Sequence, residues 1–135
     1  MMEPPETSGR NVVDSSGWIE YFADGPNADF FAGAVEDAAA LIVPTISIYE
    51  VFKRLLREVG GEDDALRVIA AMQRGELVEL DAELALEAAR LSTSLKVPMA
   101  DSVILATARA HNAVLWSQDG DFEGIPGVRY VKKEA

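Results

Sequence analysis

Cysteine is absent from the 135 residues of this chain. Disulfide bonds, thiolate metal ligands and cysteine nucleophiles are therefore excluded together, and a reducing, cytoplasmic environment is expected. No apolar run approaches the roughly 18 residues that a membrane span needs, and the N-terminal segment has neither the apolar stretch nor the basic flank of a secretion signal. We therefore expect a protein that is not exported and has no contact with a membrane.

Basic residues are scarce as well, with 12 Lys and Arg against 23 Asp and Glu and a formal net charge of −11. The overall electrostatic field does not attract nucleic acid, so any nucleic-acid site must overcome this charge locally.

The only histidine is His111, and one histidine is too few for a metal-free nuclease that works with two. His111 is expected at the end of a helix, roughly 15 Å from Asp101 at the helix start, at 1.5 Å per residue.

Strand-like and helix-like segments alternate along the chain. Residues 1–9 combine proline, glycine and acidic residues without periodicity and are expected to form a flexible leader, while residues 10–135 fit one domain. No two predicted strands are joined by a hairpin turn, which indicates parallel pairing through right-handed crossovers and a three-layer α/β fold. The predicted strands are 11–14, 40–43, 77–80, 113–116 and 128–131, and the predicted helices are 48–59, 63–74, 81–95 and 101–111.

Acidic residues follow two of the predicted strands. Asp14 ends the first strand segment, and Asp119 and Asp121 come shortly after the fourth. Open parallel sheets bind ligands beyond the carboxyl ends of their strands, so these acids meet if the two strands are neighbours. Asp101 starts a helix and joins them only if the crossover brings that helix start over the same edge of the sheet.

Each acid also has an ordinary structural explanation. Asp14 can begin a turn or cap the next helix, and Asp101 at a helix start interacts favourably with the helix dipole. Glu50 has Arg54 four residues further on and can form an ion pair on the helix surface. The segment 119–121 can be a plain acidic turn. Only convergence of these residues would predict a functional site.

Convergence would require a cation. Carboxylates gathered in one pocket repel one another, which raises their pKa values and destabilises the fold unless positive charge neutralises them. Oxygen ligands without cysteine and with one histidine select Mg²⁺ or Mn²⁺ rather than zinc. Acid-rich sites of this kind leave coordination positions for water and phosphate oxygens, which indicates phosphoryl chemistry.

In combination, these residues resemble those of the PIN-domain ribonucleases, particularly the VapC toxins of bacterial toxin-antitoxin pairs. The likeness covers residues 11–131. The motifs that carry it are VVDSS around Asp14, TISIYEVFKR around Glu50, MADSVILATARAHNAVLWSQ around Asp101, and SQDGDF with Asp119 and Asp121.

The resemblance implies a single PIN domain over residues 10–135, with a parallel five-stranded sheet of order 3-2-1-4-5 flanked by helices. It also implies a metal-dependent endoribonuclease that hydrolyses RNA by metal-activated water, forms a homodimer and is inhibited by a cognate VapB-like antitoxin. The catalytic residues would be Asp14, Glu50, Asp101 and Asp119. The Mg²⁺ or Mn²⁺ ligands would be Asp14, Asp101, Asp119 and Asp121. Whether Asp119 or Asp121 is the direct ligand stays open.

Further polar residues are expected to contact the substrate. Lys53, Arg54 and Arg57 follow Glu50 on one polar stripe that can guide an RNA backbone toward the acids. The same stripe can equally be a solvated face with intrahelical ion pairs. The hydroxyls of Ser16 and Ser117 can orient a ligand or water, or cap a turn.

Three other functional classes are weighed against this one. A non-catalytic PIN-like module that binds RNA or protein would have an incomplete acidic set, whereas every expected position here is acidic. Phosphate-receiving signalling domains usually have adjacent acids after the first strand, and Mg²⁺-dependent phosphatases usually have Asp-x-Asp there. Asp14 is followed by Ser15 and Ser16 instead, which disfavours both.

Overall fold

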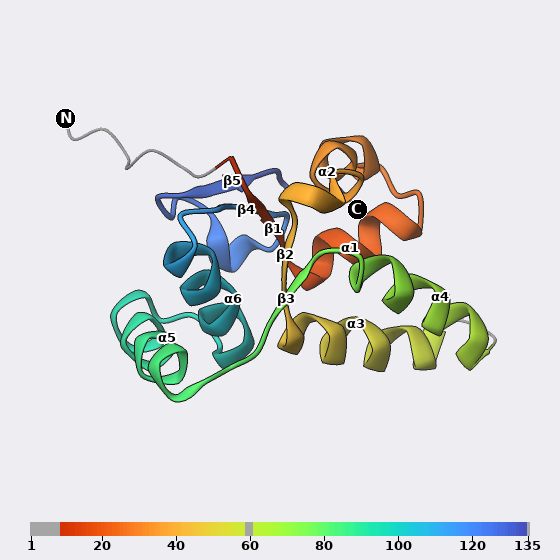
Figure 1. Cartoon of the computed structure of the whole chain (residues 1–135). Helices are drawn as coiled ribbons and strands as arrows, with labels where there is room; N and C mark the ends of the chain where they lie inside the picture. The colour runs from red at the N-terminus through yellow and green to blue at the C-terminus, as the bar shows by residue number, and fades with distance from the viewer. Residues whose placement is uncertain (1–8, 59–60, 135) are drawn as a thin grey trace.

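The strands lie side by side in the middle of the molecule, with helices on both sides of them (Figure 1). The computed structural model describes residues 9–58 and 61–134. The strands are β1 (Asn11–Val13), β2 (Ile42–Pro44), β3 (Glu76–Val78), β4 (Val114–Ser117) and β5 (Val128–Tyr130). The α-helices are α1 (Ser15–Phe22), α2 (Ala28–Val35), α3 (Thr45–Glu58), α4 (Glu62–Met72), α5 (Ala82–Leu95) and α6 (Met99–Ala110), and the short 3₁₀ helices are η1 (Ala38–Ala40) and η2 (Gly120–Phe122).

All strand pairs are parallel, and they form two ladders rather than one continuous sheet. One ladder has the order β1-β4-β5 and the other consists of β2 and β3. A single bridge between Asn11 and Leu41 joins them. The predicted neighbours are thus correct, but the expected five-stranded sheet is split into three and two strands. Backbone groups of alternate residues point to opposite sides of a strand, so the three-residue β1 directs only one or two residues toward β2, which suits a bridge rather than a long ladder.

The sheet separates two hydrophobic cores, which establishes the three layers. Val12 and Leu115 face a core formed with α5 and α6. Val13 and Val43 face a second core that contains Trp18 and side chains of α1, α2, α3 and α4. Successive residues of a strand point to opposite faces, so the pair Val12 and Val13 contributes one side chain to each core.

The residues at several helix ends are of the types that cap or terminate helices. Asp81 caps α5 by accepting a hydrogen bond from the Leu84 amide at 2.8 Å. The helix stops at Lys96, whose φ of 57° is left-handed, and Asn112 after α6 has a φ of 51°. The predicted strands and helices are all found, with ends that differ by a few residues, whereas α1 and α2 are not among the predicted helices.

Some predictions concern residues that the structure does not describe. The predicted leader falls there except for Gly9, and so does residue 59, the predicted last residue of the helix observed as α3. Among the helices in the described part of the chain, none combines the length and the apolar character needed to cross a bilayer.

Candidate active site

Asp14 lies at the carboxyl end of β1 and is the N-cap residue of α1. Its carboxylate is only 2% exposed. It accepts hydrogen bonds from the Gly17 amide at 2.9 Å, from the Ser16 hydroxyl at 2.9 and 3.0 Å to its two oxygens, and from the Ser117 hydroxyl at 2.6 Å. The carboxylate is therefore fixed by three donors from two neighbouring strand ends.

Ser117 connects the acid of β1 to the loop that follows β4. Its hydroxyl donates to Asp14 and accepts a hydrogen bond from the Asp119 amide at 2.9 Å. Ser117 is fully buried, so its hydroxyl serves the two aspartates and has no exposed surface for a ligand. The parallel pairing of β1 with β4 brings these residues together although they are 103 positions apart in the sequence.

Replacing Ser117 by alanine is expected to lower the free energy of unfolding by about 1–3 kcal/mol. The substitution removes a donor from the buried Asp14 carboxylate and an acceptor from the Asp119 amide, and unsatisfied buried polar groups cost this much. Urea denaturation measures the change. Ser94→Ala on the exposed side of α5 is the matched control, expected to stay within about 0.5 kcal/mol of the wild type. Equal stability of the two variants would contradict the bonding role of Ser117.

Two helices supply the other acids. Asp101 lies in the first turn of α6, and Glu50 projects from α3. Glu50 accepts a hydrogen bond from the Ser15 hydroxyl at 2.6 Å, which ties α3 to the start of α1. The ion pair that the structure shows for Arg54 is with Glu58, at 3.0 Å, and not with Glu50.

The loop after β4 contributes Asp119 and Asp121. Asp119 is the N-cap residue of η2 and accepts a hydrogen bond from the Asp121 amide at 2.9 Å. Asp101, Asp119 and Asp121 each offer a carboxylate oxygen, and these oxygens all lie within 4.8 Å of one another. This distance is about twice a metal–oxygen bond length of roughly 2.0–2.6 Å, so the three carboxylates can reach one cation.

The electrostatics of the cluster reflect crowding of negative charge. Burial, followed by the repulsion from Asp119, Asp14, Asp121 and Glu50, raises the pKa of Asp101 to about 7. Burial also raises the pKa of Asp14 to about 6, although the hydrogen bonds from Ser117, Gly17 and Ser16 oppose the shift. Without a cation, this pocket therefore holds protons that isolated carboxyl groups would release near neutral pH.

One open pocket of about 340 Å³ brings most of the predicted site residues together. Three residues that were not predicted also line it: Ser15, Ile19 and Tyr49. Sequence spacing gave no signal for Ser15, because its partner Glu50 is 35 residues away. Asp121 belongs to the carboxylate cluster but not to this lining, and Ser117 lies buried beneath it. The predicted residues that line the pocket are Asp14, Ser16, Glu50, Lys53, Arg54, Arg57, Asp101 and Asp119.

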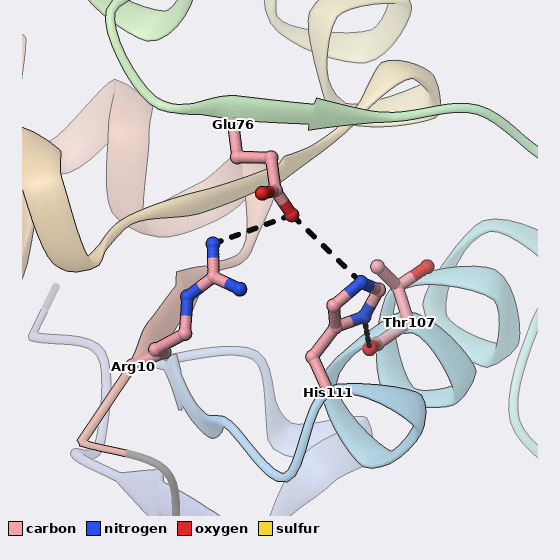
Figure 2. A network of polar contacts seen from close by, with 4 residues as sticks. All are labelled: Arg10, Glu76, Thr107 and His111. Carbon is pink, nitrogen blue, oxygen red and sulfur yellow. Dashed lines mark hydrogen bonds and ion pairs between the residues drawn. The ribbon is translucent and has the colours of Figure 1, made fainter.

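The single histidine lies elsewhere. His111 is the C-cap residue of α6 and lines a different pocket with Asp81 and Arg109. Figure 2 shows its ring beside Glu76 of β3: Nδ1 donates to the Thr107 carbonyl at 2.9 Å, and Nε2 is 3.9 Å from the Glu76 carboxylate. Arg10 contacts the same carboxylate at 3.3 Å. This network links the two strand ladders at a distance from the acidic pocket.

Solved structures with this fold share little sequence with the chain. A toxin-antitoxin complex from Klebsiella pneumoniae has a TM-score of 0.74 at 23% identity, covering 88% of this chain and 95% of its own. VapC20 of Mycobacterium tuberculosis, described as a sarcin-ricin loop cleaving toxin, has a TM-score of 0.70 at 19% identity, with coverage of 89% and 99%. VapBC2 from Rickettsia felis, bound to a DNA fragment from the promoter, has a TM-score of 0.67 at 15% identity, with coverage of 90% and 97%.

These similarities establish the fold alone, because the identities are too low to transfer an activity to this chain. The comparison with curated protein sequences finds no significant match. The PIN domain family, in contrast, matches residues 12–128, a range that includes every acid of the pocket. This chain belongs to the PIN-domain family.

Proposed function

We propose that this protein is a VapC-like endoribonuclease that hydrolyses RNA phosphodiester bonds with the help of Mg²⁺ or Mn²⁺. The observation that supports it most is the acidic pocket, where carboxylates from β1, α3, α6 and the loop after β4 meet beside a cationic stripe of α3. Acids that hold a metal and cations that bind a polyanion are the two components expected of metal-dependent phosphodiester hydrolysis.

The donor set fits a hard divalent cation. Asp101, Asp119 and Asp121 would hold it, because their oxygens lie within one coordination sphere. In this proposal Asp14 is a further ligand: it lines the same pocket, and the Ser16 hydroxyl, which contacts both of its oxygens, would release one of them to the ion. When bound, such an ion lowers the pKa of a coordinated water and neutralises charge on the phosphodiester.

The remaining residues position these groups. Ser16 and Ser117 hold the Asp14 carboxylate in one orientation, and Ser15 does the same for Glu50. Glu50 lines the pocket and in this proposal completes the site directly or through water. No side chain is required as a nucleophile.

The cationic stripe would bind the RNA backbone. Lys53 and Arg57 are exposed and Arg54 is half-buried, and all three line the acidic pocket. Lys53 lies 5.6 Å from the Tyr49 ring centroid, which keeps its ammonium beside an exposed aromatic side chain. Phosphates bound along α3 would bring a neighbouring phosphodiester over the carboxylates.

Cleavage of a panel of structured RNAs by the purified protein tests this proposal. We expect cutting with Mn²⁺ or Mg²⁺, none with EDTA, and products with a 5′-phosphate and a 3′-hydroxyl. Asp14→Asn should cut much more slowly, since the variant loses a carboxylate that borders the metal site. Undiminished cutting in EDTA would contradict the proposal. Tight RNA binding without cutting under every condition would favour a non-catalytic RNA-binding module instead.

Partner and localisation belong to the same proposal. Several neighbours in fold are toxin-antitoxin complexes, and three are described as bound to DNA. We therefore propose a cytoplasmic homodimer that a VapB-like antitoxin inhibits. The net charge of −11 and the acidic pocket suit a basic antitoxin segment.

A further inference from the structure

A second pocket of about 460 Å³ adjoins the acidic one. The two pockets share Ser16, Arg54 and Asp119 in their linings, so they are continuous at the mouth of the site. The second pocket extends away from the carboxylates toward the segment after β5, where Tyr130, Lys132 and Lys133 line it. A ligand that occupies the acidic pocket can therefore extend into this one.

The charge of the second pocket is opposite to that of the whole protein. Arg54, Lys132 and Lys133 face a single carboxylate, Asp119, in its lining. Both lysines are exposed, and within residues 9–58 and 61–134 neither takes part in an ion pair. Five of the 12 Lys and Arg residues line one pocket or the other, which concentrates the scarce positive charge of an acidic protein around one site.

The segment that carries these lysines is held in place by buried polar groups. The Val131 amide donates to the Ser117 carbonyl at 3.0 Å, which continues the pairing of β5 with β4. The Asn27 side-chain amide donates to the Lys132 carbonyl at 3.0 Å and to Gln118 at 2.9 Å. Asn27 is 8% exposed and Gln118 is 3% exposed. Asn27 thus connects the backbone of Lys132 to Gln118, the residue after Ser117. The side chain of Lys132 takes no part in these bonds and can bind a ligand.

An aromatic side chain lines the second pocket together with the lysines. Tyr130 is half-buried at the end of β5 and lines the second pocket. A cationic groove that includes an exposed aromatic face is the arrangement with which proteins bind single-stranded nucleic acid, because the cations contact phosphates and the ring stacks on a base. An acidic peptide would use the lysines but not the ring.

We propose that this second pocket is a subsite for the single-stranded RNA that flanks the scissile phosphodiester. Lys132 and Lys133 bind backbone phosphates, and Tyr130 stacks on a base of the same strand. This inference rests on the proposed function, since the acidic pocket must hold the scissile bond for the flanking strand to arrive here. It adds a feature that the acids and the α3 stripe do not provide, a fixed path for the strand on one side of the cut.

Binding of a fluorescein-labelled single-stranded RNA, measured by fluorescence anisotropy in EDTA over a series of salt concentrations, tests the subsite. Each of Lys132→Gln and Lys133→Gln should reduce the slope of log K against log salt by about 0.7, the value for one lost phosphate contact on a single strand. The double variant should bind about tenfold more weakly at low salt. Lys96→Gln, at the end of α5 and outside both pockets, is the matched control and should leave the slope unchanged.

Substitutions of Tyr130 separate stacking from packing. Tyr130→Phe keeps the ring and should bind RNA as the wild type does, whereas Tyr130→Leu should weaken binding about fivefold or more. Thermal unfolding of both variants shows whether the fold is intact. Equal binding by Tyr130→Leu and Tyr130→Phe, unchanged slopes for both lysine variants, or lysine variants that lose an acidic peptide but not RNA would each overturn the subsite.

Different experimental outcomes would contradict the subsite and the nuclease activity. Metal-dependent cutting together with unchanged salt slopes overturns the subsite alone. Lysine-dependent RNA binding by a protein that cuts no RNA supports the binding path and overturns the nuclease. A kinetic measurement adds a second readout: the lysine double variant should raise KM for a long RNA several-fold more than KM for a dinucleotide, which fills less of the second pocket, whereas Lys96→Gln should change neither.

Discussion

Asp101→Asn is expected to abolish most RNA cleavage while it stabilises the metal-free protein. Loss of a residue beyond the direct metal ligands typically costs about 10- to 100-fold, so loss of a proposed direct ligand should cost at least about a hundredfold. Four neighbouring carboxylates repel the carboxylate of Asp101. Burial, which is the largest cause, and this repulsion together raise the pKa of Asp101 to about 7. Asparagine keeps the size of the side chain and removes the charge.

The two effects have opposite signs, which makes the experiment selective. The cleavage rate with Mn²⁺ and the melting temperature in EDTA are measured near pH 8, where Asp101 is ionised in the wild type. We expect a melting temperature several degrees higher in the variant, because about 1 kcal/mol corresponds to roughly 2–8 °C in domains of this size range. Asp63→Asn in the first turn of α4 is the matched control, an exposed acid that also lies in the first turn of its helix but outside the pocket. A less stable variant that still cuts RNA would contradict both the site and its electrostatics.

The parallel pairing of the strands and the position of Asp14 could be predicted because each depends on local pattern, whereas the strand order was implied only by the family resemblance. Short β-branched segments separated by helices leave parallel pairing as the solution, and an acid after a strand then lies at a known edge of the sheet. Asp14 also shows that the two interpretations of such an acid do not exclude each other. It caps α1 by accepting from Gly17, and it lines the pocket.

The split of the sheet and the helix α2 could not be predicted, for physical reasons. A three-residue strand carries too little pattern to show how many ladder bonds it forms on each side. The start of α2 has no side-chain cap. The side chain of Asn27, the N-cap residue, makes no capping bond and donates instead to Gln118 and to the Lys132 carbonyl. The adjacent aromatics Phe30 and Phe31 further obscure the helical period in a segment of eight residues.

The convergence of the acids depended on contacts between distant segments. Asp101 reaches the pocket because α6 starts over the strand ends, and no spacing within its own helix indicates that. Glu50 is held by Ser15 rather than by the arginine one turn away. Sequence could therefore nominate the acids through family resemblance, whereas their shared pocket required the folded chain.

The metal-free protein is expected to lose stability as the pH rises from about 4 to about 7. Asp14 and Asp101 have folded-state pKa values of about 6 and about 7, above the value of 3.8 for an unperturbed aspartate. A raised pKa means that the folded state binds more protons than the unfolded state in this range, so the free energy of unfolding falls with increasing pH. For the buried Asp14 the loss is about 3 kcal/mol, complete above about pH 6.

Mg²⁺ or Mn²⁺ should reverse this loss, because the ions bind the ionised carboxylates of the folded state and compete with protons. At a free ion concentration of about 100 times Kd, the gain is about 2.7 kcal/mol, and it should be larger near pH 8 than near pH 5. Urea denaturation across this pH range, in EDTA and with each ion, measures both trends. Potassium chloride at matched ionic strength separates screening from binding, and an Asp14→Asn, Asp101→Asn double variant should lose most of the pH dependence. A flat profile in EDTA, or equal stabilisation by potassium, would show that these carboxylates do not form a cation site.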